Sequence, residues 1–260
     1  MTVEVVPPEG PDAGIILDAL SSLSDLPIDG FSVATNPVAK PRMSAMAMCS
    51  LIQETVSKPA TLHCTTRDHN RLSLQGKLWG ARALGIETIL VATGDFVALG
   101  DRGTTTTVRD MDVYGLVKMA RAVGMKTGVV FDTHPEMHGL KQAVRHLERK
   151  TEAGAQFAVT QPVYDEAGVD LLAESVRHID IPIIMGILPL RTPRHAMFLH
   201  ERVGGIIVPG ALRDRMHRAT DPVAEGAFNA KKMIGLARAR FSGVCVMPPF
   251  DHYEVLADIL

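Results

Sequence analysis

Cysteine is scarce in this chain, and the cysteines present are not paired along the sequence. The 260 residues include only Cys49, Cys64 and Cys245, which are odd in number and widely spaced. The absence of a CxxC pair leaves no cysteine metal or redox motif, and scattered single thiols are typical of proteins kept in a reducing compartment. We interpret all three as core thiols and expect a cytoplasmic protein.

An excess of charge of either sign is also missing. Lys and Arg number 27 against 29 Asp and Glu, so no net field would attract nucleic acid or an anionic membrane surface. No apolar run approaches the length of a bilayer span, and the first residues lack the basic and then apolar pattern of a signal peptide. Small molecules are therefore the expected partners, with no nucleic acid and no membrane.

Short runs rich in β-branched residues recur along the chain, with helical stretches between most of them. Segments such as 72–84, 113–123, 140–153 and 226–240 carry apolar residues at three- and four-residue spacing, as helices that cover a sheet do. Alternating β and α units predict parallel strands, and eight of them predict an α/β fold of the closed (βα)8, or TIM, barrel type. The candidate strands are 3–6, 30–35, 60–64, 88–93, 126–131, 156–161, 181–188 and 243–248.

Neither a linker nor an internal repeat divides the chain, so we expect a single domain over residues 1–260. A doubly wound open sheet is the alternative, but no GxGxxG motif follows any candidate strand, so a Rossmann nucleotide site has no support. The stretch 205–212 contains a proline and glycines, and we interpret it as a turn leading into a helix rather than a further strand.

One acidic residue interrupts the first candidate strand. Glu4 lies among Val3, Val5 and Val6, and two prolines follow this run directly. Parallel strands are usually buried on both faces, so a carboxylate within one must lie where a partner or a ligand uses it. The alternative is a frayed chain end in which Glu4 simply faces water.

Polar residues stand at the carboxyl ends of several other candidate strands, the face that carries the active sites of barrel enzymes. So many polar groups at one mouth would be costly unless they bound a polar ligand. A metal site of two histidines and one carboxylate is an alternative, but no HxH or HxxxE spacing supports it. The polar residues concerned are Thr35, Asn36, His63, Arg67, Asp68, Thr93, Gly94, Asp95, Asp132, His134, Thr160 and Gln161.

The motifs at these strand ends resemble those of the methylenetetrahydrofolate reductase family over nearly the whole chain. The most specific are HCTTRDHNR at 63–71 and LQGKLWGARALGIETILVATGD at 74–95, where a strand leads to a helix and then to a strand ending in GD. The stretches 108–112 and 186–216 are most similar to reductase domains fused to homocysteine methyltransferases. The supporting matches are EVVPP at 4–8, HPE at 134–136, RKTEAGAQFAVTQPVYD at 149–165 and GILPL at 186–190.

The resemblance implies a flavoprotein of one-carbon metabolism and methionine biosynthesis that holds FAD and interconverts 5,10-methylenetetrahydrofolate and 5-methyltetrahydrofolate. It implies that Glu4 is the general acid toward the folate's N10, and that Asp95 lies between flavin and folate and stabilises the developing cation. It also implies that Gln161 hydrogen-bonds the pterin. The residues implied to line the flavin are Thr35, His63, Thr93, Gly94, Asp95, His134 and Lys150.

Two departures from the family pattern leave an alternative open. Where the family often has a tyrosine at the end of the fifth strand and an aspartate that holds the flavin's adenosine portion, this chain has Val130 and Ala143. The alternative is a flavin-poor or partner-dependent folate-binding subunit of a methyl-transfer complex, working with an electron-transfer or methyltransferase partner protein. No motif specifies the electron donor, which the resemblance implies to be NAD(P)H or another reductant.

Overall fold

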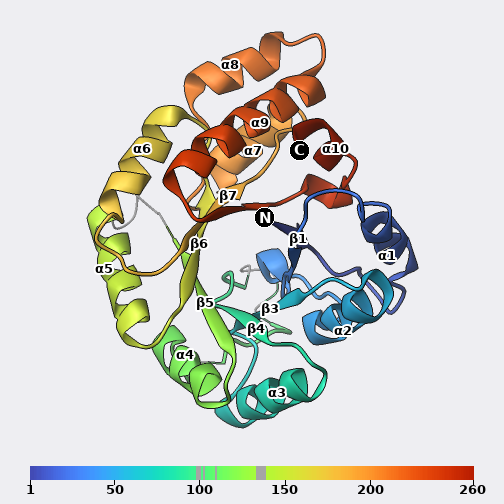
Figure 1. The fold of residues 1–260 in the computed structure, drawn as a ribbon, viewed down its shortest axis with the longest axis vertical. Helices are drawn as coiled ribbons and strands as arrows, with labels where there is room; N and C mark the ends of the chain where they lie inside the picture. Colours follow the sequence, from blue (N-terminus) through green and yellow to red (C-terminus); the bar gives the residue numbers. More distant parts are fainter. Residues whose placement is uncertain (98–100, 102, 109, 133–138) are drawn as a thin grey trace. The chain divides into compact units, whose positions relative to one another are not determined.

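The computed structural model describes residues 1–97, 101, 103–108, 110–132 and 139–260. Eight parallel strands form a closed barrel in which each strand neighbours the strands before and after it in the sequence (Figure 1). The (βα)8 prediction is therefore confirmed. The strands are β1 (Thr2–Val5), β2 (Gly30–Val33), β3 (Ala60–Thr65), β4 (Thr88–Ala92), β5 (Lys126–Phe131), β6 (Phe157–Pro162), β7 (Ile183–Ile187) and β8 (Gly243–Val246).

Helices follow the strands, and short polar residues cap several of them at their amino ends. Asn70, Asp112, Asp165, Thr192 and Asp221 each accept a hydrogen bond from a main-chain amide of the helix that follows. The helices are α1 (Gly14–Ser21), α2 (Ala45–Val56), α3 (Arg71–Ala83), α4 (Val113–Ala122), α5 (Gly139–Glu152), α6 (Glu166–Ser175), α7 (Pro193–Arg202), α8 (Gly210–Arg218), α9 (Pro222–Arg240) and α10 (Val255–Ile259), with short 3-10 turns η1 (Pro37–Ala39) and η3 (Pro249–Asp251). As predicted for 205–212, an irregular stretch leads into α8.

By internal packing the chain falls into two units. One comprises Glu4–Val129 and Arg149–Gln156, and the other comprises Met1–Val3, Val130–Glu148 and Phe157–Leu260. The expectation of a single domain stays a prediction.

In the unit that contains Glu4–Val129, helices pack on the outer faces of the strands. Helix α2 contacts β2 and β3, and α4 contacts β4. Apolar residues such as Leu62 and Ile89 are fully buried on the strands. Cys49 and Cys64 are also buried here, as is Cys245 in the other unit, which confirms their prediction as core residues.

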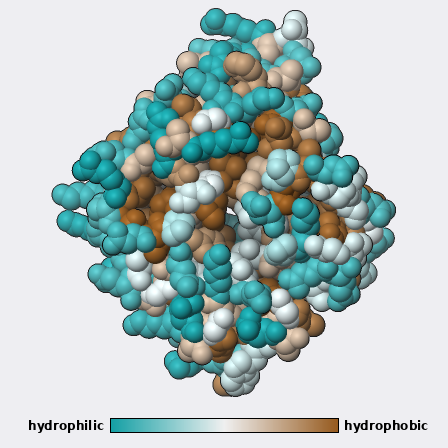
Figure 2. Space-filling model, viewed as in Figure 1, coloured by the Kyte–Doolittle hydropathy of each residue, from teal (hydrophilic) through white to brown (hydrophobic). Residues whose placement is uncertain are grey.

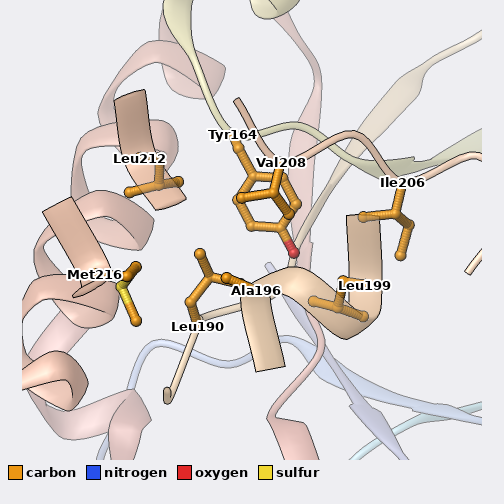
Figure 3. Close-up of a cluster of buried hydrophobic side chains, with 8 residues drawn as sticks. All are labelled: Tyr164, Leu190, Ala196, Leu199, Ile206, Val208, Leu212 and Met216. Atoms are coloured by element: carbon orange, nitrogen blue, oxygen red, sulfur yellow. The ribbon is translucent and has the colours of Figure 1, made fainter. Parts of the chain in front are cut away.

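The other unit is organised around α9, which contacts β7, β8, α6, α8 and α10. Beside it lies a cluster of buried side chains, drawn in Figure 3, in which residues from α7, α8 and the connecting segment surround the ring of Tyr164. Where α9 passes the segment after β7, a Cβ at Gly226 would lie 1.8 Å from the carbonyl oxygen of Leu190. The helix can therefore approach this segment only because position 226 has no side chain.

Charged and polar residues dominate the face of the molecule seen in Figure 2, with hydrophobic side chains visible in the gaps between them. Among the described residues, none of the helices combines the length and the apolar character needed to span a bilayer.

Candidate functional site

Glu4 lies on β1 and is held in an environment that disfavours its charge. The strand alternates, with Val3 and Val5 fully buried and Glu4 partly buried between them. Burial, and to a smaller extent the negative charge of Asp95, together raise the pKa of Glu4 to about 7. The pKa of Glu4 thus lies close to neutral pH, and because β1 pairs with β8 and buries Val3 and Val5, the frayed alternative does not describe this strand.

We expect Glu4→Gln to stabilise the protein at pH 8 but not at pH 4.5. The pKa of Glu4 is about 7 when folded against an ordinary 4.5, so the folded state binds more protons than the unfolded state between these values. The stability linked to this proton is present below pH 4.5 and is lost as the pH rises through 7, a loss of up to about 3 kcal/mol. Urea unfolding at both pH values measures it, with the exposed Glu87→Gln as control. An equal change at the two pH values would contradict the assignment.

Asp95 follows the carboxyl end of β4, where its side chain is exposed to solvent. One carboxylate oxygen, Oδ2, accepts a hydrogen bond from the main-chain amide of Val38 at 2.6 Å. Gly94, just before it, has φ +91°, and a Cβ there would lie 3.1 Å from the Cβ atoms of both Thr65 and Arg67. A glycine is therefore needed for the turn that carries the chain from β4 to Asp95.

The segment that donates to Asp95 is conformationally strained. Asn36, Val38 and Ala39 have φ values of 44°, 49° and 55°, in the left-handed region that a β-branched residue such as Val38 rarely adopts. Such residues cost on the order of 1–3 kcal/mol each and tend to cluster at functional sites. The strain supports a functional interpretation of this segment.

His63 on β3 is a neutral, hydrogen-bonded side chain. Burial lowers its pKa to about 4, and its Nε2 atom lies 2.6 Å from the hydroxyl of Ser32 on β2. The hydroxyl of Thr35 donates to the main-chain oxygen of His63. The structure thus brings these two predicted residues together, and Ser32 joins them. Ser32 could have been found from the sequence by the pattern that indicated Glu4, because it is a polar residue within the apolar run 30–35.

Arg67 and Asp68, which follow the carboxyl end of β3, form an ion pair. Arg67 is only 4% exposed, and its Nε and Nη2 atoms donate to the two carboxylate oxygens of Asp68. Although burial alone would raise the pKa of Asp68, the hydrogen bonds and charge of Arg67 hold it below its usual value. Sequence reasoning placed both residues at a strand end but gave them no role.

Gln161 lies near the end of β6, in the other unit, at an irregularity in the sheet. The register between β6 and β7 shifts between Val159 and Pro162. At this point the hydroxyl of Thr160 donates to the main-chain oxygen of Gln161 at 2.8 Å and accepts the amide of Gly186 at 3.0 Å. Bulges of this kind re-aim a side chain near active sites, which supports Gln161 as a ligand-binding candidate.

The other residues implied to line the cofactor are Thr93, Lys150 and His134. Thr93 is exposed at the end of β4, and its carbonyl accepts the amide of Arg67. Lys150 lies in the last turn of α5, where its carbonyl accepts the amide of Ala155 ahead of β6. Its main chain is therefore at the amino ends of the strands, away from Thr93, and only an extended ligand could reach both. His134 lies outside the described residues, so the metal alternative that requires it stays untested.

A protonated carboxyl, a carboxylate and a neutral imidazole within one set of strand ends can transfer a proton and stabilise a nearby cation. A family model described as methylenetetrahydrofolate reductase matches residues 1–239. The chain belongs to the methylenetetrahydrofolate reductase family. The roles that the sequence resemblance implies for Glu4, Asp95 and Gln161, as acid, cation-stabilising residue and pterin ligand, stay predictions.

Relatives in this family include two eukaryotic proteins. A Caenorhabditis elegans protein named "Probable methylenetetrahydrofolate reductase (NADPH)" is 28% identical over 138 residues, which cover 50% of this chain and 20% of that protein. The Saccharomyces cerevisiae protein "Methylenetetrahydrofolate reductase 2" is 32% identical over 99 residues, 36% of this chain and 16% of its own. The matched stretches therefore span a fifth or less of either relative.

A solved structure shares the fold over nearly the whole chain. It is described as an uncharacterized protein from Clostridium thermocellum that binds two copies of 5-methyl-5,6,7,8-tetrahydrofolic acid. The TM-score is 0.69 at 12% identity, covering 99% of this chain and 92% of that one. A phosphonopyruvate hydrolase also matches, with a TM-score of 0.54 at 15% identity and coverage of 94% of this chain and 73% of that one. At such identities these likenesses show the fold alone.

Proposed function

We propose that this family member is an oxidoreductase that binds reduced folate and interconverts 5,10-methylenetetrahydrofolate and 5-methyltetrahydrofolate. The observation that carries the proposal is the place of Glu4 within β1, between the fully buried Val3 and Val5, where burial and the charge of Asp95 raise its pKa to about 7. A general acid works best when its pKa lies near the working pH, because it must hold a proton and still release it. An ordinary surface glutamate would be ionised and could not donate.

In this proposal Glu4 protonates N10 of 5,10-methylenetetrahydrofolate as the bond between N10 and the methylene carbon breaks. The ring opening leaves a positive charge shared by N5 and that carbon. Asp95, whose charge acts on Glu4, stabilises this cation. In the opposite direction Glu4 takes the proton back as the ring closes, so one residue serves both directions.

The polar groups at the ends of β2 to β4 include hydrogen-bond donors and acceptors that fit the ring and polyol chain of a flavin. It offers the exposed hydroxyl of Thr93, the neutral ring of His63 and the carboxylate of Asp95, all suited to uncharged polar groups. Bound FAD would supply the hydride that turns the methylene unit into a methyl group. Thr35, Gly94, His134 and Lys150 complete the proposed cofactor residues, with Lys150 able to meet only the far end of an extended FAD.

Gln161 is proposed to bind the pterin through its side-chain amide, which can donate and accept at once. The solved structure described as binding 5-methyl-5,6,7,8-tetrahydrofolic acid supports a folate ligand for this fold. NAD(P)H or another reductant would regenerate the reduced flavin, and a cytoplasmic location is proposed on the composition alone.

A second candidate is a flavin-poor, partner-dependent folate-binding subunit. It is favoured by Ala143, which is buried on α5 with 8% of its surface exposed and offers no polar group to a cofactor. Val130, on β5, likewise has an apolar side chain. In this version the folate residues act as above, and an electron-transfer or methyltransferase partner supplies what the chain lacks.

We expect protein purified with FAD to show flavin absorbance that bleaches when 5-methyltetrahydrofolate is added without oxygen. The methyl group would then give two electrons to the flavin and become the methylene bridge. Unmethylated tetrahydrofolate is the matched control, since it has the same pterin but no methyl group to oxidise, and should bind without bleaching. Binding of both ligands by a colourless protein would favour the second candidate. Binding of neither would overturn both.

A further inference from the structure

The guanidinium of Arg67 joins the ends of three strands. Besides its two bonds to Asp68, Nη1 donates to the main-chain oxygen of Asp95 at 3.0 Å, and Nη2 donates to that of Asn36 at 3.3 Å. Asn36 follows β2, Arg67 follows β3 and Asp95 follows β4. One side chain therefore bonds to the segments after β2, β3 and β4.

The neighbours of Arg67 fix it in place. Its own amide donates to the carbonyl of Thr93, and its carbonyl accepts the amide of Val108. Asp68 is tied in turn to the side chains of Asn36 and Thr65, each at 3.3 Å. A planar guanidinium with several donors suits this set of carbonyl and carboxylate oxygens, whereas an ammonium on a flexible stem does not.

The Arg67 side chain of this ion pair is 4% exposed and that of Asp68 is 23% exposed. Replacing a buried ion pair with apolar residues of similar volume is often neutral or stabilising. The partners of Arg67 are not spread through the core but are the two segments that carry Asp95 and donate to it. Val38, whose amide bonds the Asp95 carboxylate, lies two residues after Asn36.

We propose that Arg67 is a positioning residue that fixes the main chain of Asp95 and the segment 36–39, and thereby aims the Asp95 carboxylate at Glu4 and at the substrate cation. The substrate part of this inference rests on the proposed function. The effect on Glu4 does not, because it concerns only the relation of two carboxyl groups within the protein. Arg67 itself touches neither substrate nor cofactor.

The test compares Arg67→Lys with Asp95→Asn and the wild-type chain. Arg67→Lys keeps the charge but loses the planar fork, so Asp95 is no longer fixed. We expect kcat to fall about tenfold to 100-fold, since small misplacements near reacting groups have effects of this size, with less change in KM. The pH profile of kcat should also shift, its Glu4 limb moving to lower pH toward that of Asp95→Asn. NMR titration of the 13C-labelled glutamate carboxyl groups follows the same change without any activity.

Arg121→Lys is the matched control, because Arg121 also bonds a main-chain oxygen, that of Met125, and a side chain, that of Gln156. It does so beside the amino end of β5, so its variant should leave Glu4 unchanged. A folded Arg67→Lys with lower activity but an unshifted Glu4 titration would overturn the proposal, since a merely structural role predicts that result.

Asp68→Asn is a second, more conservative variant, and we expect it to lower the pKa of Glu4 as Arg67→Lys does. Its result decides the question if Arg67→Lys does not fold. If neither folds, exchange of the Arg67 guanidinium hydrogens in the wild-type chain decides instead: slow exchange supports the bonds to Asp95 and Asn36, and exchange as fast as in free arginine refutes them. A wild-type protein that neither binds nor converts folate would refute the proposed function alone, because the Glu4 titration still tests Arg67.

Discussion

Glu4→Gln is expected to reduce folate turnover by about 100-fold to 10,000-fold, the range that general acids contribute, while folate binding stays within a few-fold of wild type. Glutamine has nearly the shape of protonated glutamic acid and can donate a hydrogen bond, but it cannot release a proton. Because the pKa of Glu4 is about 7, Glu4 is largely neutral in the free site below neutral pH, and there the substitution hardly changes the electrostatics. Steady-state rates and equilibrium binding of 5-methyltetrahydrofolate measure the two effects separately.

Two controls separate chemistry from a general disturbance. Glu87→Gln changes an exposed carboxylate just before β4 and should leave the rate unchanged. Asp95→Asn should lower both the rate and the pKa of Glu4, because the charge that helps keep Glu4 protonated is gone. Wild-type turnover by Glu4→Gln at neutral pH would remove Glu4 from the mechanism.

Gly226→Ala is expected to destabilise the protein by about 3 kcal/mol or more, the upper part of the range for overpacked sites. The added Cβ would lie 1.8 Å from the carbonyl oxygen of Leu190 and 2.7 Å from its carbonyl carbon. These are main-chain atoms, so no side chain can rotate to make room. Helix α9 would have to move away from the segment after β7, and thermal or urea unfolding would record the loss.

Gly235→Ala is the natural comparison because it lies on the same helix, and nothing lies within 4 Å of a Cβ placed there. Alanine favours a helix interior over glycine by about 1 kcal/mol, so this variant should be slightly more stable than wild type. Similar destabilisation by both variants would mean that helix α9 is generally intolerant of change, and that the contact with Leu190 is not the cause.

The barrel could be predicted from the sequence because its signals are local. Parallel strands are indicated by apolar runs, and the helices between them by apolar residues at three- and four-residue spacing. The bounds of β5 were therefore predicted correctly, and those of the other strands within two residues. Glu4 was visible for the same reason, since a carboxylate in a buried strand breaks a local pattern. That Glu4 lies near Asp95, 91 positions later, was implied only by the family resemblance.

The geometry of the site could not be predicted because it depends on contacts between segments far apart in the chain. No pattern indicates that Arg67 bonds the main chain of both Asn36 and Asp95, or that Val38 donates to the Asp95 carboxylate. The bulge beside Gln161 likewise arises from pairing with β7. Nor does a sequence match reveal that the main chain of Lys150 lies in the last turn of α5, ahead of β6.

Folding raises the pKa of Glu4 and lowers the pKa of His63, so the two groups have opposite effects on proton uptake. Between about pH 4.5 and 6.5, Glu4 holds a proton that it would lack in the unfolded chain, and His63 lacks one that it would hold there. Folding therefore takes up almost no net protons from these two groups in this range. The proton that Glu4 takes up on folding is therefore offset by the proton released from His63, which lies two strands further along the barrel.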